Sequence, residues 1–175
     1  TNAVTFSNTG TTQIGDANGD TNTFNGGVTA TAGAVTASGS VVTSEDDLAL
    51  GAVTLVDAQT LTLDTANTGG GNITVASLTG VTGGGSENIT LESGSGTITV
   101  SGEVGTDIGT LTLQENAAGA SGAVSLQGNV EAGTLTTFAQ AYDVSLLGGS
   151  TITNAVTFSN TGILRLGDDS AASNQ

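Results

Sequence analysis

The chain lacks several residue types whose side chains carry most protein chemistry. It contains no cysteine, histidine, lysine, proline, methionine or tryptophan. Without cysteine, disulfides and thiolate metal sites are excluded. Without histidine, lysine or cysteine, the commonest general bases and nucleophiles are missing as well. We therefore expect that the chain is not an enzyme.

Positive charge is almost as scarce. Arg165 is the only basic residue against 16 acidic ones, which gives a net charge of −15. A chain this acidic repels phosphate groups, so we expect no binding to nucleic acid. No apolar run approaches the roughly 20 residues of a membrane-spanning helix, so we expect no membrane insertion.

What the sequence does contain is a recurring triplet of an apolar residue, Thr or Ser, and a second apolar residue. In an extended strand, alternate side chains face opposite sides, so each triplet directs two apolar side chains inward and its hydroxyl outward. Glycine-rich separators supply the turns. No segment has the apolar spacing of an amphipathic helix, so the sequence predicts an all-β fold. The triplets occupy residues 4–6, 53–55, 61–63, 73–75, 89–91, 98–100, 111–113, 124–126, 144–146 and 156–158.

Two periods are nested in the chain. Residues 1–10 recur without change as residues 153–162, an offset of 152 residues. We therefore predict that residues 1–152 form one full repeat unit and that residues 153–175 begin the next, within a longer tandem array. Inside the unit, alternate triplets often lie near 20 residues apart, as from Val53 to Ile73.

Short strands at even spacing are typical of either a parallel β-helix or a β-sandwich. The very short strands and the spacing near 20 residues favour the β-helix. So does the 3% aromatic content, because a sandwich usually centres on a large aromatic side chain. At ~4.8 Å per coil, about eight coils of roughly 20 residues would form a rod roughly 40 Å long. Tandem β-sandwiches are the alternative.

The residue pattern of the chain resembles that of a known family. Residues 23–28 (Thr-Phe-Asn-Gly-Gly-Val), 51–55 (Gly-Ala-Val-Thr-Leu) and 109–113 (Gly-Thr-Leu-Thr-Leu) resemble the repeats of filamentous-haemagglutinin-type exoproteins. Giant bacterial β-strand-repeat surface adhesins have a similar residue pattern. The resemblance extends over essentially the whole chain. It implies a right-handed parallel β-helix, an extracellular or bacterial cell-surface location, and roles in adhesion, cell contact or biofilm.

One polar cluster resembles a calcium loop. Asp16, Asn18, Asp20 and Asn22 alternate, as the hard oxygen ligands of such a loop do. The glycine and glutamate that an EF-hand requires later in the loop are missing. A polar turn is the alternative. We retain these four residues as a calcium candidate and expect no other cofactor.

Two further features have simpler explanations than a site. The acidic run at residues 45–47 could bind a cation or a saccharide, but a solvated loop is the favoured explanation. Four outward threonine pairs resemble the Thr-x-Thr faces of ice-binding solenoids. Their gaps of 37, 13 and 24 residues share no coil length, so we expect no regular threonine face. The pairs are Thr60/Thr62, Thr97/Thr99, Thr110/Thr112 and Thr134/Thr136.

These observations lead to one main hypothesis. The chain is expected to be a structural stalk or fibre segment of a large repetitive bacterial cell-surface or secreted protein. Its expected partners are adjacent copies of the same repeat, stacked end to end. The alternative is a module on the same rod that binds a cell-surface glycan, a protein or calcium. A polysaccharide-degrading enzyme is the third possibility.

Overall fold

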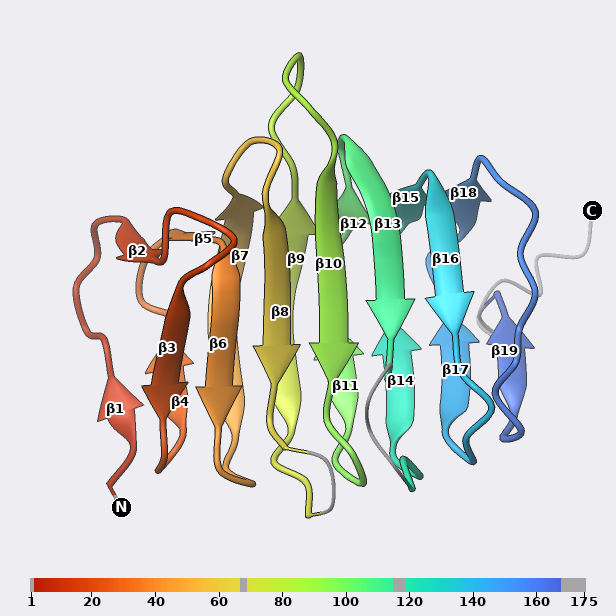
Figure 1. Ribbon diagram of the computed structural model, residues 1–175, viewed down its shortest axis with the longest axis horizontal. Coiled ribbons are helices and arrows are strands. Elements are labelled where there is room, and N and C mark those ends of the chain that lie inside the picture. The colour runs from red at the N-terminus through yellow and green to blue at the C-terminus, as the bar shows by residue number, and fades with distance from the viewer. Residues whose placement is uncertain (1, 67–68, 115–118, 168–175) are drawn as a thin grey trace, which may run out of the picture.

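The computed structural model describes residues 2–66, 69–114 and 119–167, which contain β-strands and no helix. The backbone winds into a right-handed parallel β-solenoid of about seven turns, with β1 and β19 at opposite ends (Figure 1). Each full turn passes through three faces. The predicted parallel β-helix is thus confirmed. Within these ranges, no helix is long and apolar enough to cross a membrane.

Two of the three faces belong to one 13-stranded sheet. Two long strands, β7 (Leu48–Leu55) and β9 (Ile73–Thr79), run through both of these faces and join them. The first face also contains β1 (Val4–Thr5), β4 (Val28–Ala30), β11 (Ile98–Val100), β14 (Ala123–Leu126), β17 (Asp143–Leu146) and β19 (Leu164–Leu166). The second also contains β2 (Thr12–Ile14), β5 (Val35–Ala37), β12 (Val104–Gly105), β15 (Val130–Ala132) and β18 (Ser150–Ile152).

The third face is a separate six-stranded sheet, which lies in front in Figure 1. All of its strand pairs are parallel. Its strands are β3 (Thr21–Phe24), β6 (Gly39–Thr43), β8 (Thr60–Asp64), β10 (Glu87–Glu92), β13 (Ile108–Leu113) and β16 (Thr134–Thr137).

The coils differ in length. The register of the first face gives 20 residues from Val124 to Val144, but 25 from Ile73 to Ile98 and 26 from Ile98 to Val124. Additional residues lie in loops between faces, such as residues 80–86, which protrude at the top of Figure 1 between β9 and β10. Longer coils explain why the chain makes about seven turns where a uniform spacing near 20 predicted about eight.

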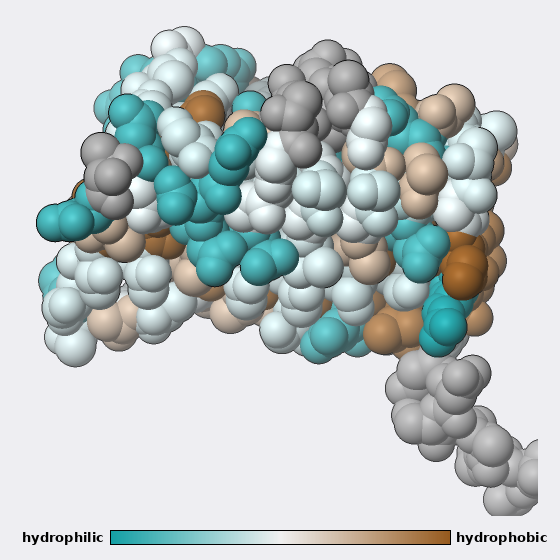
Figure 2. All heavy atoms as spheres, turned by 90° about the horizontal axis from the view of Figure 1, so that it is seen from below, coloured by the Kyte–Doolittle hydropathy of each residue, from teal (hydrophilic) through white to brown (hydrophobic). Residues whose placement is uncertain are grey.

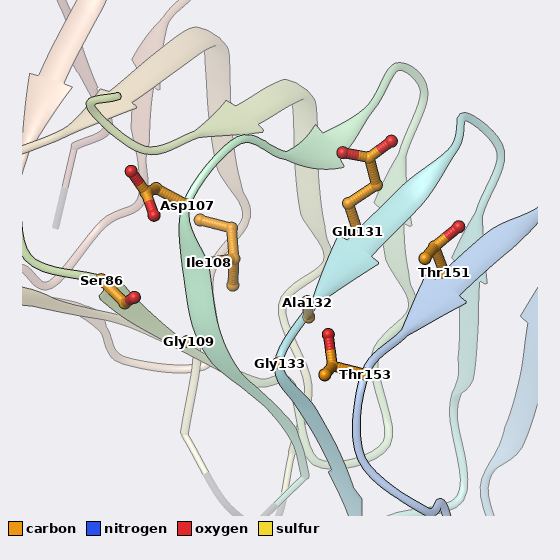
Figure 3. Close-up of a pocket in the computed structure, with 9 residues that line it drawn as sticks. All are labelled: Ser86, Asp107, Ile108, Gly109, Glu131, Ala132, Gly133, Thr151 and Thr153. Atoms are coloured by element: carbon orange, nitrogen blue, oxygen red, sulfur yellow. The ribbon is translucent and has the colours of Figure 1, made fainter. Parts of the chain in front are cut away.

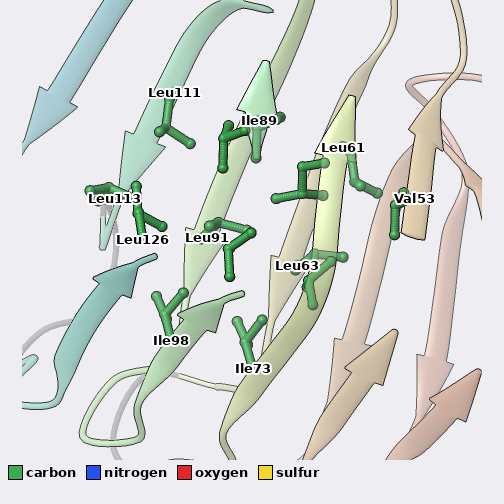
Figure 4. Close-up of a cluster of buried hydrophobic side chains, with 14 of the residues drawn as sticks. Val53, Leu61, Leu63, Ile73, Ile89, Leu91, Ile98, Leu111, Leu113 and Leu126 are labelled. Atoms are coloured by element: carbon green, nitrogen blue, oxygen red, sulfur yellow. The ribbon is translucent and has the colours of Figure 1, made fainter. Parts of the chain in front are cut away.

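The core is a continuous column of stacked aliphatic side chains. On the third face, Leu61 pairs with Ile89 and Ile89 with Leu111, and all three are fully buried (Figure 4). The triplets supply these inward positions as the alternation predicted. Because each coil packs mainly on its neighbours, stability is distributed along the column rather than concentrated at one centre.

A ladder of polar side chains holds the corner between the third and first faces. Asp47 Oδ1 accepts hydrogen bonds from the backbone N–H (2.8 Å) and the Nδ2 group (3.1 Å) of Asn72. Asn72 Oδ1 accepts in turn from the N–H (3.0 Å) and the hydroxyl (2.8 Å) of Thr97. At the same corner of later coils, Asp143 Oδ1 accepts the N–H of Ile163 at 2.7 Å. Polar side chains at the start of first-face strands thus tie one coil to the next.

The outward side of the third face carries two rows of hydroxyl and amide side chains. Three of the four threonine pairs do stack on this sheet, because loops of different length absorb the irregular sequence gaps, but Asn88 occupies one position of the row, so threonine pairs do not recur on every coil. Thr99 lies instead on β11 in the first face. The pairs that stack in register are Thr60/Thr62, Asn88/Thr90, Thr110/Thr112 and Thr134/Thr136.

The two copies of the ten-residue repeat lie on different faces. In the first copy, Val4 lies on β1 in the first face. In the second copy, Asn154 Nδ2 donates to Thr134 Oγ1 at 2.9 Å, and the N–H of Ser159 donates to Thr137 Oγ1 at 2.7 Å. Because Thr134 and Thr137 belong to β16, these bonds place the second copy against the third face. The offset of 152 residues is therefore not a whole number of coils. The division into residues 1–152 and 153–175 stays a prediction, and residues 168–175 lie outside the described ranges.

Candidate functional site

Three of the calcium candidates lie in one turn, where two side-chain oxygens already accept hydrogen bonds. Asp20 Oδ2 accepts the N–H groups of Asp16 (2.8 Å) and Ala17 (3.2 Å). Asn18 Oδ1 accepts the N–H of Thr60 at 2.5 Å, which ties the turn to β8. Asn22 lies separately on β3. Among the described residues, no group of three or more acidic side chains is arranged to hold a metal ion, and calcium binding by these four residues stays a prediction.

The hydrogen bonds within this turn affect the pKa of Asp20. The N–H groups of Asp16 and Ala17 stabilise its carboxylate and lower its pKa from the ordinary value of 3.8. The stability that these bonds contribute is therefore fully present at pH values above the ordinary pKa. It is lost as the pH falls through the lowered pKa of Asp20. In an NMR titration, we expect the amide protons of Asp16 and Ala17 to shift with a midpoint below 3.8.

The matched variant for this titration is Asp20→Asn, which removes the titrating group and keeps a side-chain acceptor. We expect the acid-dependent shift of the two amide protons to become smaller in this variant, because the Asp20 carboxylate no longer contributes to it. A midpoint at or above the ordinary value in the wild type would contradict the assignment of these hydrogen bonds.

The acidic run at residues 45–47 is divided among contacts between coils. Asp47 belongs to the polar ladder, and Glu45 Oε1 accepts the N–H of Gly69 at 3.2 Å. These contacts agree with a structural loop.

A groove runs along the corner between the second and third faces. It has a volume of about 340 Å³ and crosses four successive coils, from Ser86 to Thr153. Four coils at ~4.8 Å spacing give a length of about 14 Å. Gly109 and Gly133 occupy the corner in consecutive coils, where the N–H of Gly133 donates to the carbonyl of Ile108 at 2.8 Å. Because these corner residues have no side chains, the backbone itself forms part of the floor.

Glycine is required at this corner. A Cβ atom at Gly133 would lie 2.7 Å from the carbonyl oxygen of Gly109. Ile108 and Ala132 also line the groove and are buried, with exposed fractions of 4% and 6%. The floor is therefore formed by backbone and small apolar side chains.

Two carboxylates and three hydroxyls line the groove. In Figure 3, Asp107 and Glu131 lie along one side of it, and Ser86 and Thr153 lie along the other. Thr151 is the next-coil partner of Glu131 on the second face. The other lining residues are the glycines and apolar residues of the floor, so the lining contains no basic side chain.

Each carboxylate is oriented by one hydrogen bond. Asp107 Oδ2 accepts the N–H of Gly83 at 3.2 Å, and Glu131 Oε1 accepts from Asn129 Nδ2 at 2.9 Å. In the described part of the chain, the second oxygen of each carboxylate makes no hydrogen bond. Glu131 also lies over Gly105, which has no side chain to fill the space beside it. Both carboxylates therefore keep acceptor capacity for a ligand.

This groove was not predicted from the sequence. Its two acidic residues belong to different coils, and only the register brings them to the same corner. One signal was available: residues 107–112 read Asp-Ile-Gly-Thr-Leu-Thr and residues 131–136 read Glu-Ala-Gly-Thr-Leu-Thr. The spacing of these two segments equals the coil length measured on β13 and β16, where Thr110 pairs with Thr134.

Comparison of the chain with models of protein families, with curated protein sequences and with solved structures finds no match.

Proposed function

We propose that the chain is a structural rod segment of a large repetitive bacterial cell-surface or secreted protein, serving adhesion, cell contact, biofilm or filament formation. The observation that supports this proposal is the parallel pairing that continues from β1 to β19. A solenoid of this kind can be lengthened coil by coil without a new core, because each coil needs only its neighbours. Seven coils at ~4.8 Å give a segment roughly 34 Å long.

The two end coils support stacking between adjacent copies. At the C-terminal end, Ile163, Leu164 and Leu166 are exposed by 56%, 40% and 64%, and Val4 is 39% exposed at the other end. Figure 2 shows brown apolar atoms gathered at the end of the molecule where the C-terminal coil lies. Parallel strands with exposed backbone and apolar side chains can pair with a further coil. The repeated segment lies on the first face at residue 4 and on the third face after residue 153. A copy that continued the 152-residue period would therefore be rotated by one face about the axis of the rod, relative to the copy before it.

Electron microscopy of the chain over a range of concentrations tests this proposal. We expect thin unbranched rods of constant width that lengthen as the concentration rises. In a variant that carries Leu164→Glu and Leu166→Glu, the added charges should prevent stacking. Ser145→Glu, an outward position within the first face, is the control and should still stack. Compact single particles at every concentration would argue against end-to-end stacking.

A further inference from the structure

We propose that the groove between the second and third faces binds an oligosaccharide that carries amino groups. This inference goes beyond the structural role, since a rod needs no ligand. The groove is an open hollow with a few polar groups in its lining, a feature that ligand sites commonly share.

The carboxylates determine what kind of group the ligand must offer. Ionised Asp107 and Glu131 can only accept hydrogen bonds, so the ligand has to donate. No basic side chain of the lining neutralises them, and Arg165, the single cation of the chain, lies on β19 in the first face. A positively charged amino group is therefore favoured over a neutral hydroxyl, because charge-assisted hydrogen bonds are the stronger ones. Acidic sugars are disfavoured by the net charge of −15.

The remaining lining suits the hydroxyl groups of a sugar chain. Ser86, Thr151 and Thr153 offer hydroxyls that can both donate and accept. The glycine floor lets a sugar ring approach the backbone closely. A groove about 14 Å long across four coils has room for a few linked sugar units.

Calorimetric titration of the folded chain with a glucosamine oligomer tests this inference. The comparison ligands are an N-acetylglucosamine oligomer and a galacturonate oligomer of the same length. We expect measurable binding of the glucosamine oligomer, weaker binding of the acetylated oligomer and none of the acidic one. The titration is repeated at raised salt to screen attraction between exposed charges.

Two variants separate the groove from the overall charge. Glu131→Gln keeps the shape of the side chain and removes a charge from the groove. Glu103→Gln removes the same charge from an exposed position at a different corner. Loss of one hydrogen bond to a charged group should weaken binding about tenfold in Glu131→Gln. Binding to Glu103→Gln should stay within about twofold of the wild type, as expected for a distant exposed charge.

Three results would overturn the inference: no binding of any oligomer, equal loss in both variants, or acetylated and acidic oligomers bound as tightly as glucosamine. Equal loss would show attraction to the overall charge rather than to the groove. Melting curves followed by circular dichroism establish that both variants are folded. Because the rod is tested by microscopy, a failure here is distinguishable from a failure of the structural proposal.

Discussion

Gly128→Ala is expected to destabilise the solenoid by about 3 kcal/mol, at the upper end of the range for overpacking. Gly102, Gly128 and Gly148 stack at the corner between the first and second faces. A Cβ atom at Gly128 would lie 2.2 Å from the carbonyl carbon of Gly102 and 2.6 Å from the nitrogen of Glu103. These contacts are with backbone, which cannot rotate away as a flexible side chain can. The two coils would have to separate locally to admit the methyl group.

Two other glycines provide the controls for this measurement. A Cβ atom at Gly19 would have no atom within 4 Å, so Gly19→Ala should change the free energy of unfolding by no more than about 0.5 kcal/mol. Gly83 also has open space but adopts a φ of +87°, so Gly83→Ala should cost about 1 kcal/mol from backbone strain alone. Denaturant unfolding followed by circular dichroism gives all three values. A Gly128→Ala value no larger than that of Gly83→Ala would contradict the close stacking of coils at this corner.

Tyr142→Phe is expected to cost about 2–4 kcal/mol, since it leaves the buried carbonyl of Leu113 and the half-buried N–H of Phe138 without their hydroxyl partner. Tyr142 is fully buried between β16 and β17. Its hydroxyl accepts the N–H of Phe138 at 2.9 Å and donates to the carbonyl of Leu113 at 3.1 Å. One hydroxyl thus connects two successive coils. Thr136→Val is the control, because it removes a hydroxyl from the outward side of the third face.

Tyr142 also makes the stability of the fold depend on pH in the alkaline range. Burial raises the pKa of its phenol above the ordinary value of 10.0, because the charged form is poorly solvated there. The stability that the Tyr142 hydroxyl contributes is therefore complete at pH values below the ordinary pKa. It is lost as the pH rises through the raised pKa. Tyr142 is the only tyrosine, so phenolate absorbance reports on it alone. Titration at an ordinary pKa in the folded protein, or equal destabilisation by Thr136→Val, would contradict this role.

The sequence was sufficient to predict which side chains face inward. Leu61, Ile89 and Leu111 alternate with threonines or other polar residues, and period-two alternation specifies two sides of a strand wherever one side is buried. The same alternation serves all three faces, so it does not specify which face a triplet joins. For this reason the identical segments at residues 4–6 and 156–158 could occupy different faces.

The register between coils could not be predicted from the sequence. It depends on the number of residues in each loop, and loops such as residues 80–86 have no period of their own. The threonine rows of the third face and the groove at Asp107 and Glu131 both depend on that register. Both were therefore missed, although the repeated acidic-x-Gly-Thr-Leu-Thr segment contained the information for the groove.

Disulfide formation between introduced cysteines tests the stacking of coils most directly, because the native chain has no cysteine. Ser125 pairs with Ser145 in adjacent coils of the first face. Paired strands lie ~4.8 Å apart, within the Cα separation that a disulfide accepts. Thr99 pairs with Ser125, so it lies two coils from Ser145, or roughly 10 Å.

We predict that the double variant Ser125→Cys/Ser145→Cys forms an intramolecular disulfide on mild oxidation and keeps its fold, as judged by mass spectrometry and circular dichroism. The double variant Thr99→Cys/Ser145→Cys should remain reduced under the same conditions. Failure of the first pair to cross-link, or equal cross-linking of both pairs, would contradict the parallel register on which the rod depends.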